Sequence, residues 1–152
     1  RSMANLYLWL KFLHIAGLGV FLLAHGVAAG SSLMLRRAST NAMRAALLRA
    51  SIQSAVAFYP ALLVIVVTGV WMGFEGHWWR SGWIWAGIIT LVAVIVIMSA
   101  VSVPYHKARD AANAKPPADL EPVLKAARPV EVAGVGAIGL FILFFLMVFK
   151  PF

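Results

Sequence analysis

The stretch from Tyr7 to Ser32 constrains this chain most, because it is almost wholly apolar yet contains two histidines and one lysine. About 26 helical residues, at a rise of about 1.5 Å each, are enough to cross a hydrocarbon core of roughly 30 Å. Hydrophobicity does not explain an imidazole at that depth, so His14 and His25 are the first candidates for a function. In a helix, the step from His14 to His25 is a rotation of about 20° more than three full turns, so both rings lie on one face. The two rings differ in depth by roughly 16 Å.

The composition of the whole chain indicates the same environment. Of its 152 residues, 62% are hydrophobic and 12% are charged, and that charged fraction is about half the value for a soluble domain. We therefore expect an all-α fold, a four-transmembrane-helix bundle that forms a single integral membrane domain over residues 1–152. The expected spans are about 6–35, 52–74, 82–103 and 129–149.

The distribution of charge predicts the topology. The net charge is +8, and most basic residues lie in two loops, about 36–51 and 107–128. The first loop contains four arginines and no acid, which places it in the cytoplasm by the positive-inside rule and puts both termini on the non-cytoplasmic side. Basic loops beside spans meet anionic headgroups, so the expected partner is the lipid bilayer and not nucleic acid.

Both loops have expected local structure. Apolar residues of the first loop recur at helical spacing, which predicts a short amphipathic helix on the membrane surface. The second loop has mixed charge, a Pro116-Pro117 turn and no large apolar face, so we expect it to be partly helical at its start and mobile around the two prolines. In the second span, we expect Pro60 to bend the helix and the hydroxyl of Thr68 to bond back to its own helix.

Glycine pairs predict close helix packing. Gly26 with Gly30 and Gly69 with Gly73 form GxxxG pairs, which suit helix contacts within the chain or in a homodimer. The alternative is that glycine makes room for a planar cofactor beside His14, since Gly17 follows one turn later.

The four histidines sort by depth in this topology. His14 and His77 form an outer pair, and His25 and His106 form an inner pair, although His77 and His106 lie roughly one to two turns outside the depth of their partners. Haem iron between helices accepts two axial imidazoles. The sequence thus predicts a b-type haem held by His14 and at least one of the other three histidines, with a single pair or ligands from two copies equally compatible. A neutral imidazole that only bonds a neighbouring helix is the structural alternative.

Other chemistries are poorly supported. The absence of cysteine excludes disulfides, thiolate metal sites and iron–sulfur ligation by this chain. Copper is the rival ligand because it accepts imidazole and thioether, with His14 and His25 as candidate metal ligands. The six methionines are scattered without a Met-x-x-Met motif. No hydrolase triad, phosphate loop or HExxH motif occurs, so no catalytic residue is assigned.

The segment Tyr7-Leu-Trp-Leu-Lys-Phe-Leu-His-Ile-Ala-Gly resembles the opening helix of several small bacterial membrane families. These are the HemJ-type protoporphyrinogen oxidases, the CopD-like copper-resistance proteins and a family of predicted integral membrane proteins. The HemJ-type resemblance implies a haem-binding four-helix protein in which His14 matches the essential histidine. That family's Leu-Pro-Arg and following histidine in the first helix, and its lysine in the third, have no counterpart here. The resemblance therefore implies a functional His14 in a haem- or metal-linked protein of a bacterial inner membrane.

Three hypotheses follow from the sequence. The leading one is a membrane b-type haem-binding protein that acts in electron transfer or haem handling with a redox partner. An enzyme of this kind would be a haem-dependent membrane oxidoreductase. The second is a non-enzymatic membrane scaffold or subunit, with structural histidines and glycine faces that mediate homodimer or partner contacts. The third is a CopD-like copper-transport component.

Overall fold

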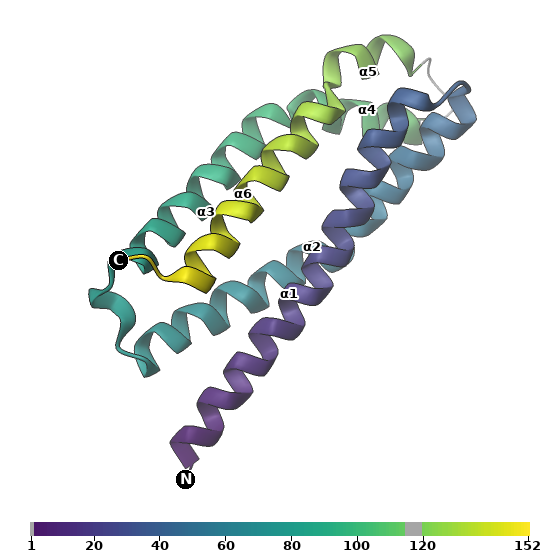
Figure 1. Cartoon of the computed structure of the whole chain (residues 1–152). Coiled ribbons are helices and arrows are strands. Elements are labelled where there is room, and N and C mark those ends of the chain that lie inside the picture. The colour runs from purple at the N-terminus through teal and green to yellow at the C-terminus, as the bar shows by residue number, and fades with distance from the viewer. Residues whose placement is uncertain (1, 115–119) are drawn as a thin grey trace.

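The computed structural model describes residues 2–114 and 120–152, and all regular structure in them is helical (Figure 1). The long helices are α1 (Ser2–Met34), α2 (Asn41–Glu75), α3 (Gly82–Val101) and α6 (Pro129–Phe149). The short elements are η1 (Leu35–Arg37), η2 (Trp78–Arg80), α4 (Val103–Asn113) and α5 (Glu121–Ala127).

Four of the described helices are long and apolar enough to cross a membrane, which confirms the predicted all-α fold with four candidate spans. They also expose large apolar side chains, such as Leu23 at 75% and Val56 at 79%. A soluble monomer rarely exposes so much contiguous apolar surface, whereas lipid tails solvate it without cost. The chain is therefore a multi-pass integral membrane protein.

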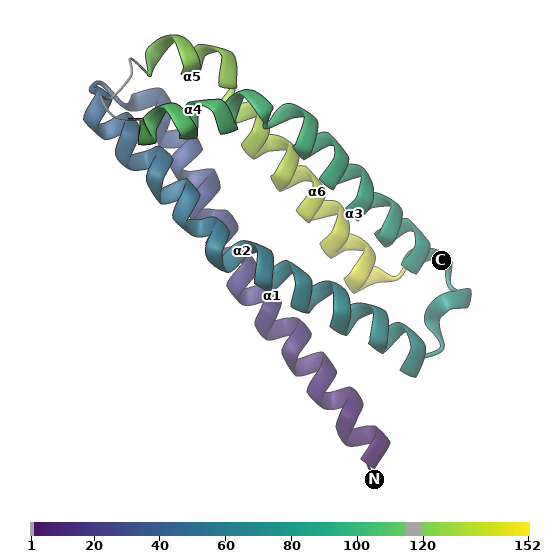
Figure 2. The same cartoon turned by 180° about the vertical axis from the view of Figure 1, so that it is seen from behind.

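The four long helices form two antiparallel pairs, α1 with α2 and α3 with α6 (Figures 1 and 2). The pairs are linked through α4 and α5 at one end of the molecule and through η2, which connects α2 to α3, at the other. Both chain termini lie toward the η2 end (Figure 1). Which side of the membrane this end faces stays a prediction.

The expected separate surface helix in the first loop is wrong, because this segment is continuous with the second span. The hydroxyl of Thr40 accepts a hydrogen bond from the amide of Met43 and caps α2, which then runs unbroken to Glu75. No glycine or proline interrupts residues 41–59, so the helix simply continues out of the bilayer. At 35 residues, α2 is about 52 Å long, well beyond the hydrocarbon thickness. The helix bends near its middle (Figure 2), and Pro60 lies inside it, as the sequence predicts.

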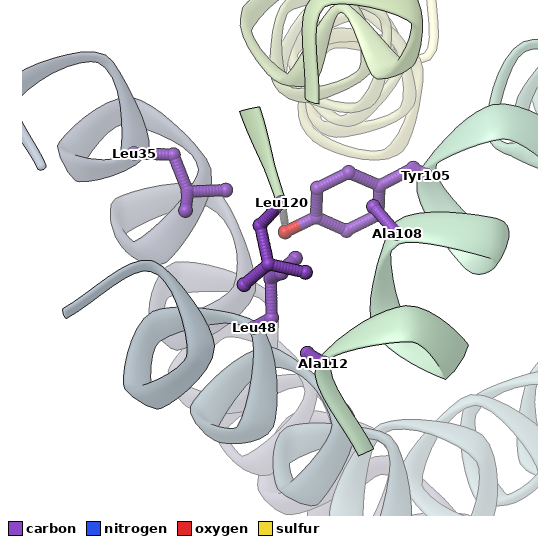
Figure 3. Packing of buried hydrophobic residues seen from close by; sticks show 6 residues of the cluster. All are labelled: Leu35, Leu48, Tyr105, Ala108, Ala112 and Leu120. Atoms are coloured by element: carbon purple, nitrogen blue, oxygen red, sulfur yellow. The ribbon is translucent and has the colours of Figure 1, made fainter. Parts of the chain in front are cut away.

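The second loop also differs from its prediction, because α4 has a buried apolar face. Tyr105, Ala108 and Ala112 follow one another at helical spacing, and all three are buried. Figure 3 shows these three side chains gathered with Leu35, Leu48 and Leu120. This cluster packs α4 and the start of α5 against η1 and α2, at one end of the α1–α2 pair. Alanines give little hydrophobic signal in a sequence, which is why this face was not expected. The predicted Pro116-Pro117 turn lies outside the described residues.

Candidate imidazole sites on α1

His14 lies where α1 packs closely against α2. Its Nδ1 is 3.0 Å from Oγ1 of Thr68. Small residues allow this approach: a Cβ on Gly69 would lie 3.2 Å from Cε1 of His14, and a Cβ on Gly17 would lie 3.1 Å from Cγ1 of Val64. The Nδ1–Cε1 edge of the ring therefore faces α2, and these glycines serve helix packing within the chain.

The hydrogen bonds of Thr68 favour the tautomer of His14 that carries its proton on Nδ1. The Thr68 hydroxyl donates to the carbonyl of Val64 at 2.6 Å, back along its own helix, as the sequence predicts. A hydroxyl has one proton, so Thr68 Oγ1 acts as an acceptor toward His14, and Nδ1–H donates to it. The neutral ring then carries its free lone pair on Nε2. The side-chain contact that His14 makes with α2 thus uses Nδ1.

His25 is packed between three helices without a polar partner. Its ring stacks on Phe21 of α1 at 5.9 Å between centroids and lies 6.1 Å from Phe58 of α2. On the third side, a Cβ on Gly136 of α6 would lie 2.8 Å from Cε1 of His25. Its Nε2 is buried and has no hydrogen-bond partner among the described residues. A buried nitrogen without a hydrogen bond destabilises the folded protein. Such an atom either binds a partner that the structure does not contain or is a cost that the packing of the ring offsets.

The other two candidate histidines are exposed and separate from these positions. His77 has a left-handed backbone, with φ of 54°, in the turn before η2. His106 lies on α4, where its Nε2 is 3.2 Å from the Ser102 hydroxyl of the preceding turn. In the described part of the chain, no contact joins His77 to His14 or His106 to His25. Nor do three side chains of the types His, Cys, Asp and Glu gather there in a metal-binding arrangement.

A polar network that the sequence did not reveal ties α4 to the α1–α2 pair. The guanidinium of Arg109 donates to Oγ and to the carbonyl of Ser51, at 2.5 and 3.0 Å. The hydroxyl of Tyr105 lies 3.4 Å from Oγ of Ser51 and 3.0 Å from Oγ of Ser32. The guanidinium also stacks over the Tyr105 ring at 5.0 Å. The i, i+4 spacing of Tyr105 and Arg109 was the available signal, but their partners on α1 and α2 lie far away in sequence.

The opposite end of the bundle is closed by aromatic side chains. The ammonium of Lys150 lies 4.6 Å from the ring centroid of Trp78 and 5.1 Å from that of Trp83. The amide of Trp83 donates to the carbonyl of Phe152 at 3.1 Å. These contacts hold the residues after α6 against the start of α3, where tryptophans are typical of a membrane interface.

Comparison with family models found a match over residues 8–151 to a family described as "Predicted integral membrane protein (DUF2269)". Comparison with curated proteins and with solved structures found no match. The matched range includes His14, His25 and all or most of each of the four described helices that are long and apolar enough to span a membrane.

Proposed function

Because the chain belongs to the DUF2269 family of predicted integral membrane proteins, we propose that it acts within the bilayer, by binding a b-type haem through Nε2 of His14. The haem would supply one-electron redox chemistry, and the protein would serve electron transfer or haem handling. His14 would hold the iron, Thr68 would orient the imidazole, and the surrounding apolar helices would exclude water.

The protonation state of His14 carries this proposal. Histidines that bind iron or zinc usually donate their other ring N–H to a carbonyl, carboxylate or hydroxyl, which fixes the tautomer and raises the basicity of the ligating nitrogen. His14 has this arrangement, with Nδ1–H directed at Thr68 and the proton of Thr68 directed at Val64. A hydrogen bond that only linked two helices would work equally well from Nε2, so the choice of Nδ1 favours a ligand role.

His25 does not supply the second ligand to the same iron. It lies about 16 Å along α1 from His14, and α6 packs so close that a Cβ on Gly136 would lie 3.1 Å from its Nε2. The arrangement therefore supports iron held by one imidazole of this chain. Any further imidazole on the iron would come from a second copy.

One observation favours the membrane scaffold as a second candidate. The fit of the His25 ring between Phe21, Phe58 and Gly136 joins α1, α2 and α6 by packing alone, which suits a structural histidine. In this account His14 would also be structural and the purified protein would bind neither haem nor copper. A copper-transport component would instead bind copper in a histidine-dependent stoichiometry.

Haem titration of the purified protein in nanodiscs tests these candidates. We expect the wild type and His77→Ala to give a Soret band, at one haem per chain or, if two copies share the iron, one haem per two chains, and His14→Ala to give none. Thr68→Val should keep the fold, because an interhelical hydrogen bond in a membrane contributes only about 0.6 kcal/mol. Loss of the orienting acceptor should nevertheless weaken haem binding about 10- to 100-fold.

Two outcomes contradict the haem proposal. If the wild type gives no Soret band with excess haem, the function is another one, and copper analysis of the same sample decides between the other two candidates. If His14→Ala retains the band that His77→Ala also retains, His14 is not the ligand.

A further inference from the structure

A hollow at the end of α1, where the helix passes into η1, combines apolar and basic side chains. It is lined by Leu33, Met34, Arg36 and Arg37. Leu33 and Met34 are 52% and 51% exposed, and both arginines are exposed as well. The hollow therefore has an apolar floor on the last turn of a membrane span and a cationic rim immediately beyond it.

The two arginines of this rim have no anionic partner in the described residues. The ion pairs there join Glu121 to Arg44 and Lys125, and Glu131 to Arg128. Neither guanidinium of the hollow takes part in one. Adjacent unpaired arginines at the end of a span attract anionic headgroups, and arginine binds phosphate oxygens through several N–H groups at once.

The face of α1 that leads to the hollow carries two glycines and is open to its surroundings. Gly26, Gly30, Leu33 and Arg37 follow the i, i+4, i+7, i+11 spacing of one helix face. A Cβ on Gly26 or on Gly30 would meet no atom within 4 Å, so this face is not covered by the rest of the chain. From Gly26 to Arg37 the helix rises about 16 Å, which is close to the depth of one leaflet of the hydrocarbon core.

We propose that this hollow binds one anionic phospholipid, with its phosphate between Arg36 and Arg37. One acyl chain would lie on Leu33 and Met34 and continue along the open face at Gly30. The charge of the rim selects an anionic headgroup, and the apolar floor selects a lipid over a soluble phosphate. This site is separate from His14 and does not depend on the haem proposal.

Native mass spectrometry of the detergent-solubilised full chain, titrated with phosphatidylglycerol, tests the proposal. Each arginine is expected to contribute roughly fivefold in affinity, so Arg36→Ala with Arg37→Ala should weaken one-to-one binding about 25-fold. The matched control is Arg49→Ala with Lys107→Ala, which removes the same charge from exposed positions. It should change the affinity twofold or less.

A second variant tests the acyl-chain contact without any change in the charge of the protein. Gly30→Leu adds an apolar side chain on the open face and keeps every charge, and its Cβ would meet no atom within 4 Å. It should therefore fold and still weaken binding of phosphatidylglycerol at least threefold. Equal losses in both double variants would overturn the proposal in favour of general surface charge. Displacement of the lipid by millimolar inorganic phosphate, or equal affinity for phosphatidylcholine, would overturn it as well.

Discussion

At the scale of single residues, His14 and His25 show how neighbours decide what an imidazole can do. The hydrogen bond to Thr68 leaves the lone pair of His14 on Nε2. His25 has a similar apolar setting, but α6 lies against its Nε2. The sequence identified both positions from depth alone. It could not separate their roles, because the difference comes from residues 54 and 111 positions away from them in the chain, Thr68 and Gly136.

Gly136 tests the packing role of His25. Gly136→Leu places atoms where the His25 ring lies and forces α6 away from α1. We expect a loss of about 1–3 kcal/mol in stability, typical of overpacking. Gly134→Leu is the matched control, because a Cβ there meets nothing within 4 Å. Thermal unfolding followed by circular dichroism in detergent measures the difference, and equal melting temperatures would contradict the proposed contact between α1 and α6.

At the scale of elements, α4 packs across the end of the α1–α2 pair and fixes its position there. Leu48 and Ala108 have no exposed surface, and Arg109 reaches across to Ser51. This arrangement makes the basic end of the molecule the best packed part, while the spans themselves rely on lipid contact. The second loop is thus a structural element and not a passive connection.

Arg109 should be the residue that keeps α4 docked against α2. Hydrogen bonds from a charged donor contribute about 1.5–3 kcal/mol, so Arg109→Ala should weaken the docking of α4 by about 2 kcal/mol. Hydrogen exchange measured by mass spectrometry should then show faster exchange across residues 103–113. The control is Lys107→Ala, whose side chain is exposed and takes part in no ion pair among the described residues. Unchanged exchange in Arg109→Ala would mean that the apolar cluster alone holds α4.

The elements that could be predicted are those set by the bilayer. A span needs about 20 apolar residues, and that requirement produces a strong signal wherever it occurs in a sequence. The extension of α2 beyond the membrane and the docking of α4 give weaker signals. Both depend on helix propensity and on alanine faces whose burial is decided by a partner elsewhere in the chain, as with Ala108 against Leu48.

At the scale of the whole molecule, the two helix pairs form an asymmetric bundle with one basic end and one aromatic end. The basic end carries α4 and α5, and the aromatic end carries the tryptophans around Lys150 and both termini. If the positive-inside rule holds, the basic end is cytoplasmic.

The absence of cysteine makes this topology directly measurable. Single cysteines at Ser39, before α2, and at Arg80, in η2, lie at opposite ends of the bundle, and both positions are exposed. A membrane-impermeant maleimide should label Arg80→Cys in intact cells and label Ser39→Cys only after permeabilisation. The reverse pattern would invert the topology and would place the proposed lipid site in the outer leaflet.

The most direct test of the account is ¹⁵N NMR of histidine-labelled protein in nanodiscs, with the His14 signals assigned by their loss in His14→Ala. In the haem-free protein we expect a protonated Nδ1 and an unprotonated Nε2 on His14. Added haem should then shift or broaden the Nε2 signal of His14, while the signals of His77 stay in place. A protonated Nε2, or a His14 signal that haem leaves unchanged, would contradict the assignment of this imidazole as an iron ligand.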